Sequence, residues 1–182
     1  MSHFSDLEGL RLAMEIEAQG YEFYRKAHDS STNPQHQLLF SFLMQEELNH
    51  TEKFKHIYES LKHKDTSEDE YLFDPEASRY LRVLVETRIF PSTAIFSNEH
   101  ELANGILQTG WTYQTPGHSS SVLTTEAILM FALQAEKDAI LFFDEMMTNA
   151  KFPEAKKVFA ELKAEEQAHV TKLQDLIVNL KK

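Results

Sequence analysis

Apolar residues recur every three or four positions through four long stretches of the chain, which is the period of one face of an α-helix. Two stretches fall within residues 5–62 and two within residues 122–181. The segments "SSTNPQ" and "TNAKFPEA" divide each region in two. Because proline is tolerated in the first turn of a helix but not in its interior, each segment predicts a turn between two helices. The pattern predicts two helical hairpins, and Ser5 with Glu8 predicts a capping box at the first helix.

The two hairpins are related in sequence. Shifting the chain by 119 positions aligns residues 12–62 with residues 131–181 without a gap, and 12 of the 51 aligned pairs are identical. The identical pairs are Ala13/Ala132, Glu17/Glu136, Phe23/Phe142, Pro34/Pro153, Phe40/Phe159, Leu43/Leu162, Glu46/Glu165, Glu47/Glu166, His50/His169, Lys53/Lys172, Leu61/Leu180 and Lys62/Lys181. Since charged residues, a proline and phenylalanines coincide together, we interpret the chain as a duplicated hairpin.

Residues 63–121 separate the two copies within what we interpret as one domain, residues 1–182. The acidic stretch "HKDTSEDEYLFDPEAS" predicts a loop, whereas "PEASRYLRVLVETRIF" reads as a helix that stops before a proline. The following "STAIFSNEHELANGILQTG" is a second candidate helix. The predicted fold is therefore all-α: a four-helix bundle with one or two extra helices in the crossover between its second and third helices.

Six polar residues interrupt the apolar faces of the four helices. They are Glu17, Glu47 and His50 in the first hairpin and Glu136, Glu166 and His169 in the second. Each histidine follows a glutamate by three residues, so both side chains point to one side of their helix. Ionised carboxylates are very unfavourable in an apolar core, and four together repel one another. Two divalent cations would balance their charge, with the imidazoles as further ligands, which is a known construction in bundle cores.

The types of donor atom limit which metals are expected to bind. Oxygen and nitrogen ligands without sulfur suit Fe or Mn, while Zn or Cu binds such sites by intrinsic affinity. A single Glu-x-x-His is usually a surface pair. The metal hypothesis therefore rests on two facts: the motif occurs twice, and each time its glutamate follows another core-facing glutamate by 30 residues. Tyr24 lies two turns after Glu17 on the same face, within reach of a ligand carboxylate.

Other polar residues have simpler interpretations. Glu46 and Glu165 also repeat, but they lie about 100° away from the core face, which indicates solvated or capping charges. His28, His36 and His56 fall on turns or polar faces and are expected to be solvated.

The composition excludes several classes of function. The formal charge of -11 argues against a general electrostatic attraction to nucleic acid or anionic membranes. The chain contains no cysteine, which excludes disulfides, thiolate metal sites and thiol nucleophiles. No apolar stretch reaches the roughly 18 residues of a membrane helix, and the first residues do not resemble a secretory signal. We expect a cytoplasmic protein.

The four long helices resemble the rubrerythrin-type branch of the ferritin-like superfamily, in particular its members without a rubredoxin domain. The segments "EAQGYEFY" and "EKDAILFF" resemble the two helices that supply one glutamate each, and "EELNH" and "EEQAH" resemble the two Glu-x-x-His helices. The resemblance implies a ferritin-like bundle with Glu17 and Glu136 as terminal ligands. It implies Glu47 and Glu166 as bridges, with His50 and His169 serving one metal each.

The same resemblance implies a function in the defence against oxidative stress. Two iron ions, with Mn or Zn as possible substitutes, would reduce hydrogen peroxide or react with dioxygen. Glu47, Glu166 and Tyr24 would form the catalytic centre of a homodimer. Without cysteine the chain carries no rubredoxin iron, so the resemblance implies an external electron donor such as a rubredoxin-like protein. One position departs from the family: Ala139 stands where rubrerythrins have a further glutamate that exchanges with a histidine.

Three other functions stay open. Activated dioxygen could oxidise an organic substrate, or the chain could bind and oxidise ferrous iron without a further substrate, as an iron-handling protein. A metal-stabilised bundle with a purely structural ion is the third alternative.

Overall fold

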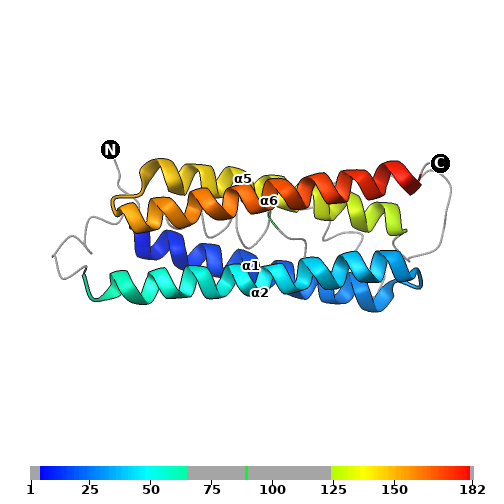
Figure 1. Cartoon of the computed structure of the whole chain (residues 1–182), viewed down its shortest axis with the longest axis horizontal. Helices are drawn as coiled ribbons and strands as arrows, with labels where there is room; N and C mark the ends of the chain where they lie inside the picture. The colour runs from blue at the N-terminus through cyan, green and yellow to red at the C-terminus, as the bar shows by residue number, and fades with distance from the viewer. Residues whose placement is uncertain (1–4, 65–88, 90–123, 181–182) are drawn as a thin grey trace, which may run out of the picture.

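A computed structural model describes residues 5–64, 89 and 124–180. Within them the chain forms four helices and no strand: α1 (Asp6–Ser30), α2 (Pro34–Lys62), α5 (Thr125–Asn149) and α6 (Pro153–Leu180). The helices form an elongated all-α bundle of two hairpins (Figure 1), which confirms the predicted fold class. The loop and extra helices predicted between the hairpins lie outside the described residues, apart from Ile89, which is buried in the bundle's core cluster.

Side-chain caps begin two of the four described helices. Asn33 caps α2 by accepting a hydrogen bond from the backbone N–H of Gln35 at 2.9 Å, with proline in the first turn. Thr124 caps α5 in the same way through the N–H of Ala127 at 3.2 Å. Ser5 is the N-cap residue of α1, but its side chain makes no capping hydrogen bond, so the predicted capping box is wrong.

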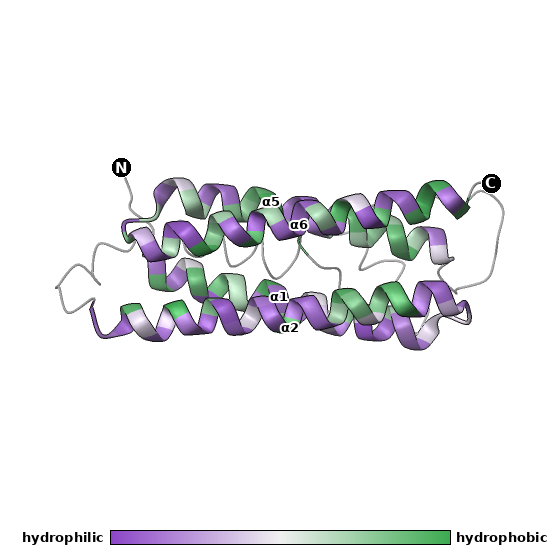
Figure 2. Ribbon diagram, viewed as in Figure 1, coloured by the Kyte–Doolittle hydropathy of each residue, from purple (hydrophilic) through white to green (hydrophobic). Residues whose placement is uncertain are grey.

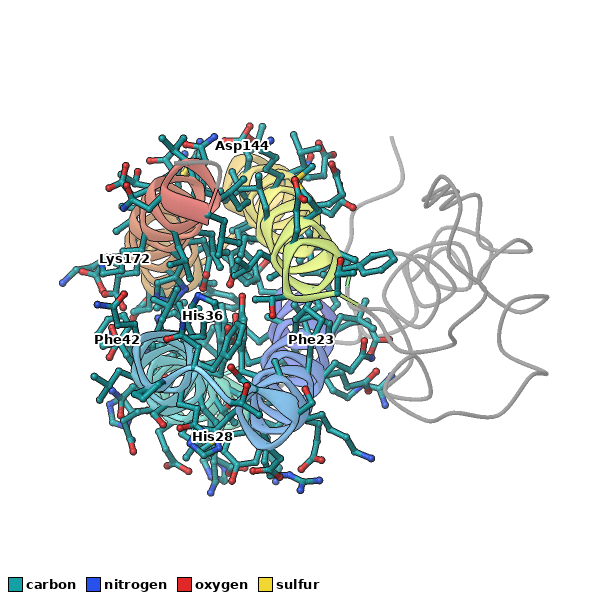
Figure 3. The ribbon with its side chains drawn as sticks, turned by 90° about the vertical axis from the view of Figure 1, so that its right-hand side faces the viewer. Phe23, His28, His36, Phe42, Asp144 and Lys172 are labelled. Carbon is teal, nitrogen blue, oxygen red and sulfur yellow. The ribbon has the colours of Figure 1, made fainter. Side chains whose placement is uncertain are left out.

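Each helix packs most extensively against its hairpin partner, α1 on α2 and α5 on α6. Across the bundle α2 faces α6 and α1 faces α5 (Figure 3). Helix α2 ends at the end of the bundle where α6 begins, whereas α5 begins at the opposite end (Figure 1). The connection from α2 to α5 therefore has to return along the length of the bundle, as the sequence predicts.

One hydrophobic cluster fills the space between the four helices. Phe23, Phe40, Phe142 and Phe159 all belong to it and are at most 7% exposed, which confirms their prediction as core residues. Hydrophilic and hydrophobic residues alternate along each helix (Figure 2), as expected when one face of each amphipathic helix is buried. None of the four described helices has the length and apolarity needed to cross a membrane.

Two contacts fix the first hairpin against the second near the start of α1. The buried carboxylate of Asp6 accepts hydrogen bonds from the backbone N–H groups of Lys151 and Phe152, at 3.0 and 2.8 Å, in the turn before α6. One turn later, a Cβ added at Gly9 would lie 2.9 Å from the sulfur of Met146. Glycine at this position therefore allows α1 to approach α5 closely.

We predict that Asp6→Ala lowers the free energy of unfolding of the metal-free protein by about 1–3 kcal/mol, because two partly buried N–H donors lose their acceptor. Asp29, also on α1, has a side chain that is 61% exposed. Asp29→Ala is the matched control and should change the free energy of unfolding by less than about 0.5 kcal/mol. Urea denaturation measures both; equal effects would contradict the role assigned to Asp6.

Candidate metal centre

Six polar side chains meet in the middle of the bundle, and each is at most 1% exposed. They are Glu17 on α1, Glu47 and His50 on α2, Glu136 on α5, and Glu166 and His169 on α6. These are the six residues that the sequence placed on the core faces. Every helix of the bundle contributes, so the site depends on the packing of both hairpins.

The side chains form two overlapping groups of four. Glu17, Glu47, His50 and Glu166 offer ligand atoms that all lie within 4.8 Å of one another, and so do Glu47, Glu136, Glu166 and His169. Glu47 and Glu166 belong to both groups. Each group is completed by one glutamate and one histidine of its own. Such an arrangement can hold two cations side by side, with the shared carboxylates between them.

The two imidazoles face the same carboxylate. His50 Nδ1 lies 2.8 Å from one oxygen of Glu166, and His169 Nδ1 lies 2.7 Å from the other. His50 Nδ1 is also 3.1 Å from a Glu17 oxygen, and His169 Nδ1 is 3.7 Å from a Glu136 oxygen. The rings stack with their centroids 5.4 Å apart. Both Nδ1 atoms thus point into the carboxylate cluster, where a metal ligand would have to point.

Burial and mutual repulsion control the protonation of the carboxylates. Burial raises the pKa of Glu17 and of Glu47 well above the usual range, and neighbouring carboxylate charges act in the same direction. Burial and the charge of Glu166 raise the pKa of Glu136 to about 8. Burial opposes the ionisation of Glu166 too, but the close contacts of its carboxylate with His169 and His50 outweigh burial and hold the pKa of Glu166 well below its usual value.

The pKa values of the two histidines shift in the direction opposite to that of an isolated buried imidazole. Burial alone would lower their pKa, but the bonds to Glu166 and Glu136 prevail. The pKa of His50 is raised to about 9 and that of His169 to about 10. In the metal-free chain, protons on the imidazoles and carboxyls therefore supply the positive charge that the cluster needs.

The donor set fits a pair of divalent cations. Oxygen Oε1 of Glu17 and Oε1 of Glu47 are buried without a hydrogen-bond partner among the described residues. Buried carboxylate oxygens normally have partners, so unsatisfied ones in the middle of a core indicate a ligand. Four carboxylates and two imidazoles provide both the charge and the mixed O and N donors that Fe or Mn prefers.

Tyr24 is fully buried, and its hydroxyl donates a hydrogen bond to Oε1 of Glu136. The sequence placed this hydroxyl within reach of a ligand carboxylate, and the structure identifies which one. Burial and the charges of Glu136 and Glu47 raise the pKa of the phenol well above its usual value, so it stays protonated and donates. The aligned position in the second hairpin is Phe143, so within the described part of the chain the repeat gives Glu17 no equivalent hydroxyl donor.

Sequence reasoning missed the role of Glu165. It predicted a solvated or capping charge, but the Glu165 side chain is only 37% exposed, and its Oε2 lies 3.0 Å from Nε2 of His50. Lys53 Nζ donates to the same carboxylate at 2.6 Å. A carboxylate behind a ligating imidazole fixes the orientation of the ring. The identity of Glu46/Glu165 and Lys53/Lys172 between the repeats was the available signal.

His36 is a second correction. The sequence predicted a solvated residue in the turn region, but His36 is 5% exposed and lies on the inner side of α2 (Figure 3). It is on the same helical stripe as Phe40 and Glu47, and burial lowers the pKa of its imidazole. The helix begins at Pro34, early enough to carry His36 into the bundle.

A comparison with models of known protein families finds a match in the second hairpin. Residues 127–182 match the family model described as Rubrerythrin. The matched region contains Glu136, Glu166 and His169, and the first hairpin repeats the same residue types at the aligned positions. No curated protein and no solved structure matches the chain significantly.

We predict that the metal-free protein loses stability as the pH rises from about 6.5 to about 9, measured as the free energy of unfolding in urea. The pKa values of His50 and His169 are raised above their usual value, so their contribution is complete below about 6.5 and is lost as the pH rises through about 9 and 10. The raised pKa of Glu136 acts in the same direction up to about 8. The lowered pKa of Glu166 adds nothing in this window, since both states are ionised there.

Bound divalent metal should remove most of this pH dependence, because the metal replaces the protons of the cluster. A metal-free protein whose stability is constant or rises over the same interval would contradict the charge balance described here.

Proposed function

The chain is a rubrerythrin-type member of the ferritin-like superfamily, and on that premise we propose that it is a non-haem di-iron oxidoreductase that reduces hydrogen peroxide, with dioxygen as the alternative oxidant. The observation that supports this most is the shared pair, Glu47 and Glu166, which belongs to both four-residue groups. Two metal ions held by common carboxylates act on one substrate together, which a single ion in the same bundle cannot do.

The charge balance supports two divalent ions. Four carboxylates carry four negative charges and two divalent cations would carry four positive charges, while the imidazoles, whose Nδ1 atoms point into the cluster, would bind as neutral ligands. Glu17 and His50 would serve one ion, and Glu136 and His169 the other. Mn or Zn would fit the same donors, but only a redox metal supports the proposed reaction.

A pair of ferrous ions held by these residues would supply the two electrons with which hydrogen peroxide and two protons give two molecules of water. The chain's residues determine where this can happen. The six ligands are buried, and Phe23, Tyr24 and Phe40 are fully buried beside them, so bulk water is excluded. Tyr24 holds Glu136 in one orientation through its hydroxyl.

Return to the ferrous state requires electrons from outside the chain, because no cysteine is present to hold a rubredoxin iron. We propose an external donor of rubredoxin-like character.

A ferrous-iron-oxidising protein would use the same residues and the acidic charge of -11 equally well. The two functions differ in turnover: a peroxidase consumes many equivalents of peroxide per chain when a reductant is supplied, and an iron-oxidising protein consumes them in proportion to the iron added.

The first test is anaerobic loading with Fe²⁺, followed by one equivalent of peroxide while the absorbance of the ferric product is recorded. We predict two irons per chain, rapid oxidation, and loss of both in Glu47→Ala/Glu166→Ala. Glu161→Gln on α6 is the control, since the Glu161 side chain is 53% exposed and, among the described residues, its ion pair is with Lys157 at 3.6 Å. Iron binding that survives the double substitution would contradict the proposed centre. Two stable Zn ions in its place, with no ferrous binding, would support a structural role instead.

We predict that Tyr24→Phe keeps two irons per chain but weakens their binding by about 10–100-fold, because Glu136 loses the donor that orients it. Competition with a ferrous chelator measures the affinity. Tyr21→Phe is the matched control, because Tyr21 is on the same helix but only partly buried. An unchanged affinity in Tyr24→Phe would show that the hydrogen bond does not organise the site.

A further inference from the structure

The two imidazoles of the metal centre are covered by different kinds of side chain. All six candidate ligands are at most 1% exposed, so a molecule from solvent reaches them only by passing between covering side chains. His50 on α2 and His169 on α6 stack where these two helices face each other. On this side of the bundle, the residues outside the two rings therefore decide where a small molecule can enter.

The cover outside His50 is an ion pair. Nε2 of His50 lies 3.0 Å from Oε2 of Glu165, and Lys53 Nζ donates to both oxygens of that carboxylate at 2.6 Å. Hydrogen bonds between ionised groups are roughly twice as strong as neutral ones. An uncharged molecule that entered here would have to separate these groups and could not replace the charge that either of them loses.

The cover outside His169 is an aromatic ring. Phe42 on α2 lies nearly perpendicular to the imidazole of His169, with the ring centroids 6.1 Å apart. Phe42 is 39% exposed and His169 only 1%, so Phe42 contacts solvent on one side and a candidate metal ligand on the other. Lys172 Nζ lies 4.9 Å from the centroid of the Phe42 ring. Figure 3 shows Phe42 and Lys172 on the same outer side of the bundle.

One difference between the repeats accompanies the two kinds of cover. Lys53 and Lys172 are aligned and identical, but the residue aligned with Phe42 in the second hairpin is Glu161. Lys53 pairs with a carboxylate, whereas Lys172 lies over an aromatic ring. A partly exposed apolar side chain is ordinary on a protein surface. Phe42 differs from such a residue because the side chain behind it is a buried candidate ligand.

The ring of Phe42 is the easier of the two covers to move. A phenylalanine side chain has no hydrogen bond to break, and a cation–π contact at an exposed site is weak. Rotamer changes of exposed side chains are also fast compared with enzymatic turnover. Displacing Glu165 instead separates it from both His50 and Lys53. Of these two covers, the one outside His169 therefore opens at the lower cost in free energy.

The residue next to this opening selects for uncharged molecules. Glu46 follows Phe42 by one helical turn, and one of its carboxylate oxygens lies within 4.8 Å of a ring nitrogen of His50 and of His169. A negative charge beside a narrow opening repels anions. Hydrogen peroxide and dioxygen are both uncharged at neutral pH, so this charge does not hinder them.

We propose that Phe42 is the gate through which a small uncharged oxidant reaches the dinuclear centre, and that the size of its side chain limits which oxidants are admitted. Movement of the ring would expose the half of the centre that contains His169 and leave the ion pair outside His50 intact. This inference rests on the proposed function, because it concerns how the oxidant reaches that centre.

The first test is the rate at which nitric oxide binds the anaerobic ferrous protein, followed by the visible absorbance of the ferrous complex after rapid mixing. Nitric oxide is a small uncharged probe whose binding requires no turnover. We predict that the rate rises in Phe42→Ala and falls in Phe42→Trp, with two irons per chain in both variants. Leu38→Ala is the matched control, since it truncates an apolar residue one turn earlier on α2 that is 71% exposed. It should bind nitric oxide at the wild-type rate.

The second test compares hydrogen peroxide with the bulkier tert-butyl hydroperoxide as oxidants of the same ferrous proteins. The ratio of their rate constants removes any general effect of a substitution on reactivity. We predict that the preference for hydrogen peroxide falls by at least about tenfold in Phe42→Ala, the lower range of discrimination by an apolar contact. Leu38→Ala should keep the wild-type preference.

The outcomes separate this inference from the proposed function. Equal rates of nitric oxide binding in wild type, Phe42→Ala and Phe42→Trp would overturn the gate and leave the dinuclear centre intact. An unchanged preference between the two peroxides in Phe42→Ala would overturn the size limit. Loss of iron from both Phe42 variants would show that the ring holds the site together, which would also overturn the gate. Fewer than two irons in the wild-type chain would contradict the dinuclear centre itself.

Discussion

Four carboxylates buried within a few ångströms of one another are the constraint on which the structure depends. Each is desolvated, each repels the others, and no lysine or arginine is among the buried residues that the structure describes. The cluster exists only with positive charge inside it. Protons on the histidines and on some carboxyls supply that charge in the metal-free chain, and divalent ions supply it more completely. The long helices and tight aromatic packing hold the ligands against their repulsion.

The duplicated hairpin makes the two metal positions similar, and a few substitutions make them different. Tyr24 donates to Glu136, whereas its counterpart Phe143 has no hydroxyl to offer Glu17. Nε2 of His50 faces the carboxylate of Glu165, to which Lys53 donates, whereas within the described residues no hydrogen bond joins His169 to the aligned Glu46. Both departures fall on the Glu136 and His169 position. One metal position therefore has a histidine whose ring is oriented by a second carboxylate, and the other has a terminal glutamate that accepts a hydrogen bond from Tyr24.

Much of this arrangement could be predicted from the sequence because helical periodicity and internal repetition are strong signals. The repeat of residues 12–62 at an offset of 119 positions identified both hairpins, and glutamates such as Glu17 and Glu136 on otherwise apolar helix faces located the ligands. Contacts between helices could not be predicted in the same way. The bond from His50 to Glu165 joins residues 115 positions apart, and its existence depends on how α2 and α6 face each other. His36 was misjudged because the helix begins only two residues before it, and a turn-region histidine is ordinarily solvated.

The most direct test of the dinuclear centre is a crystal of the iron-loaded chain, measured with X-rays on either side of the iron absorption edge. The account predicts two anomalous peaks in the bundle core. Both should contact Glu47 and Glu166, one should lie beside Glu17 and His50, and the other beside Glu136 and His169. A single peak, or iron bound only at the surface, would contradict a centre built on shared carboxylates.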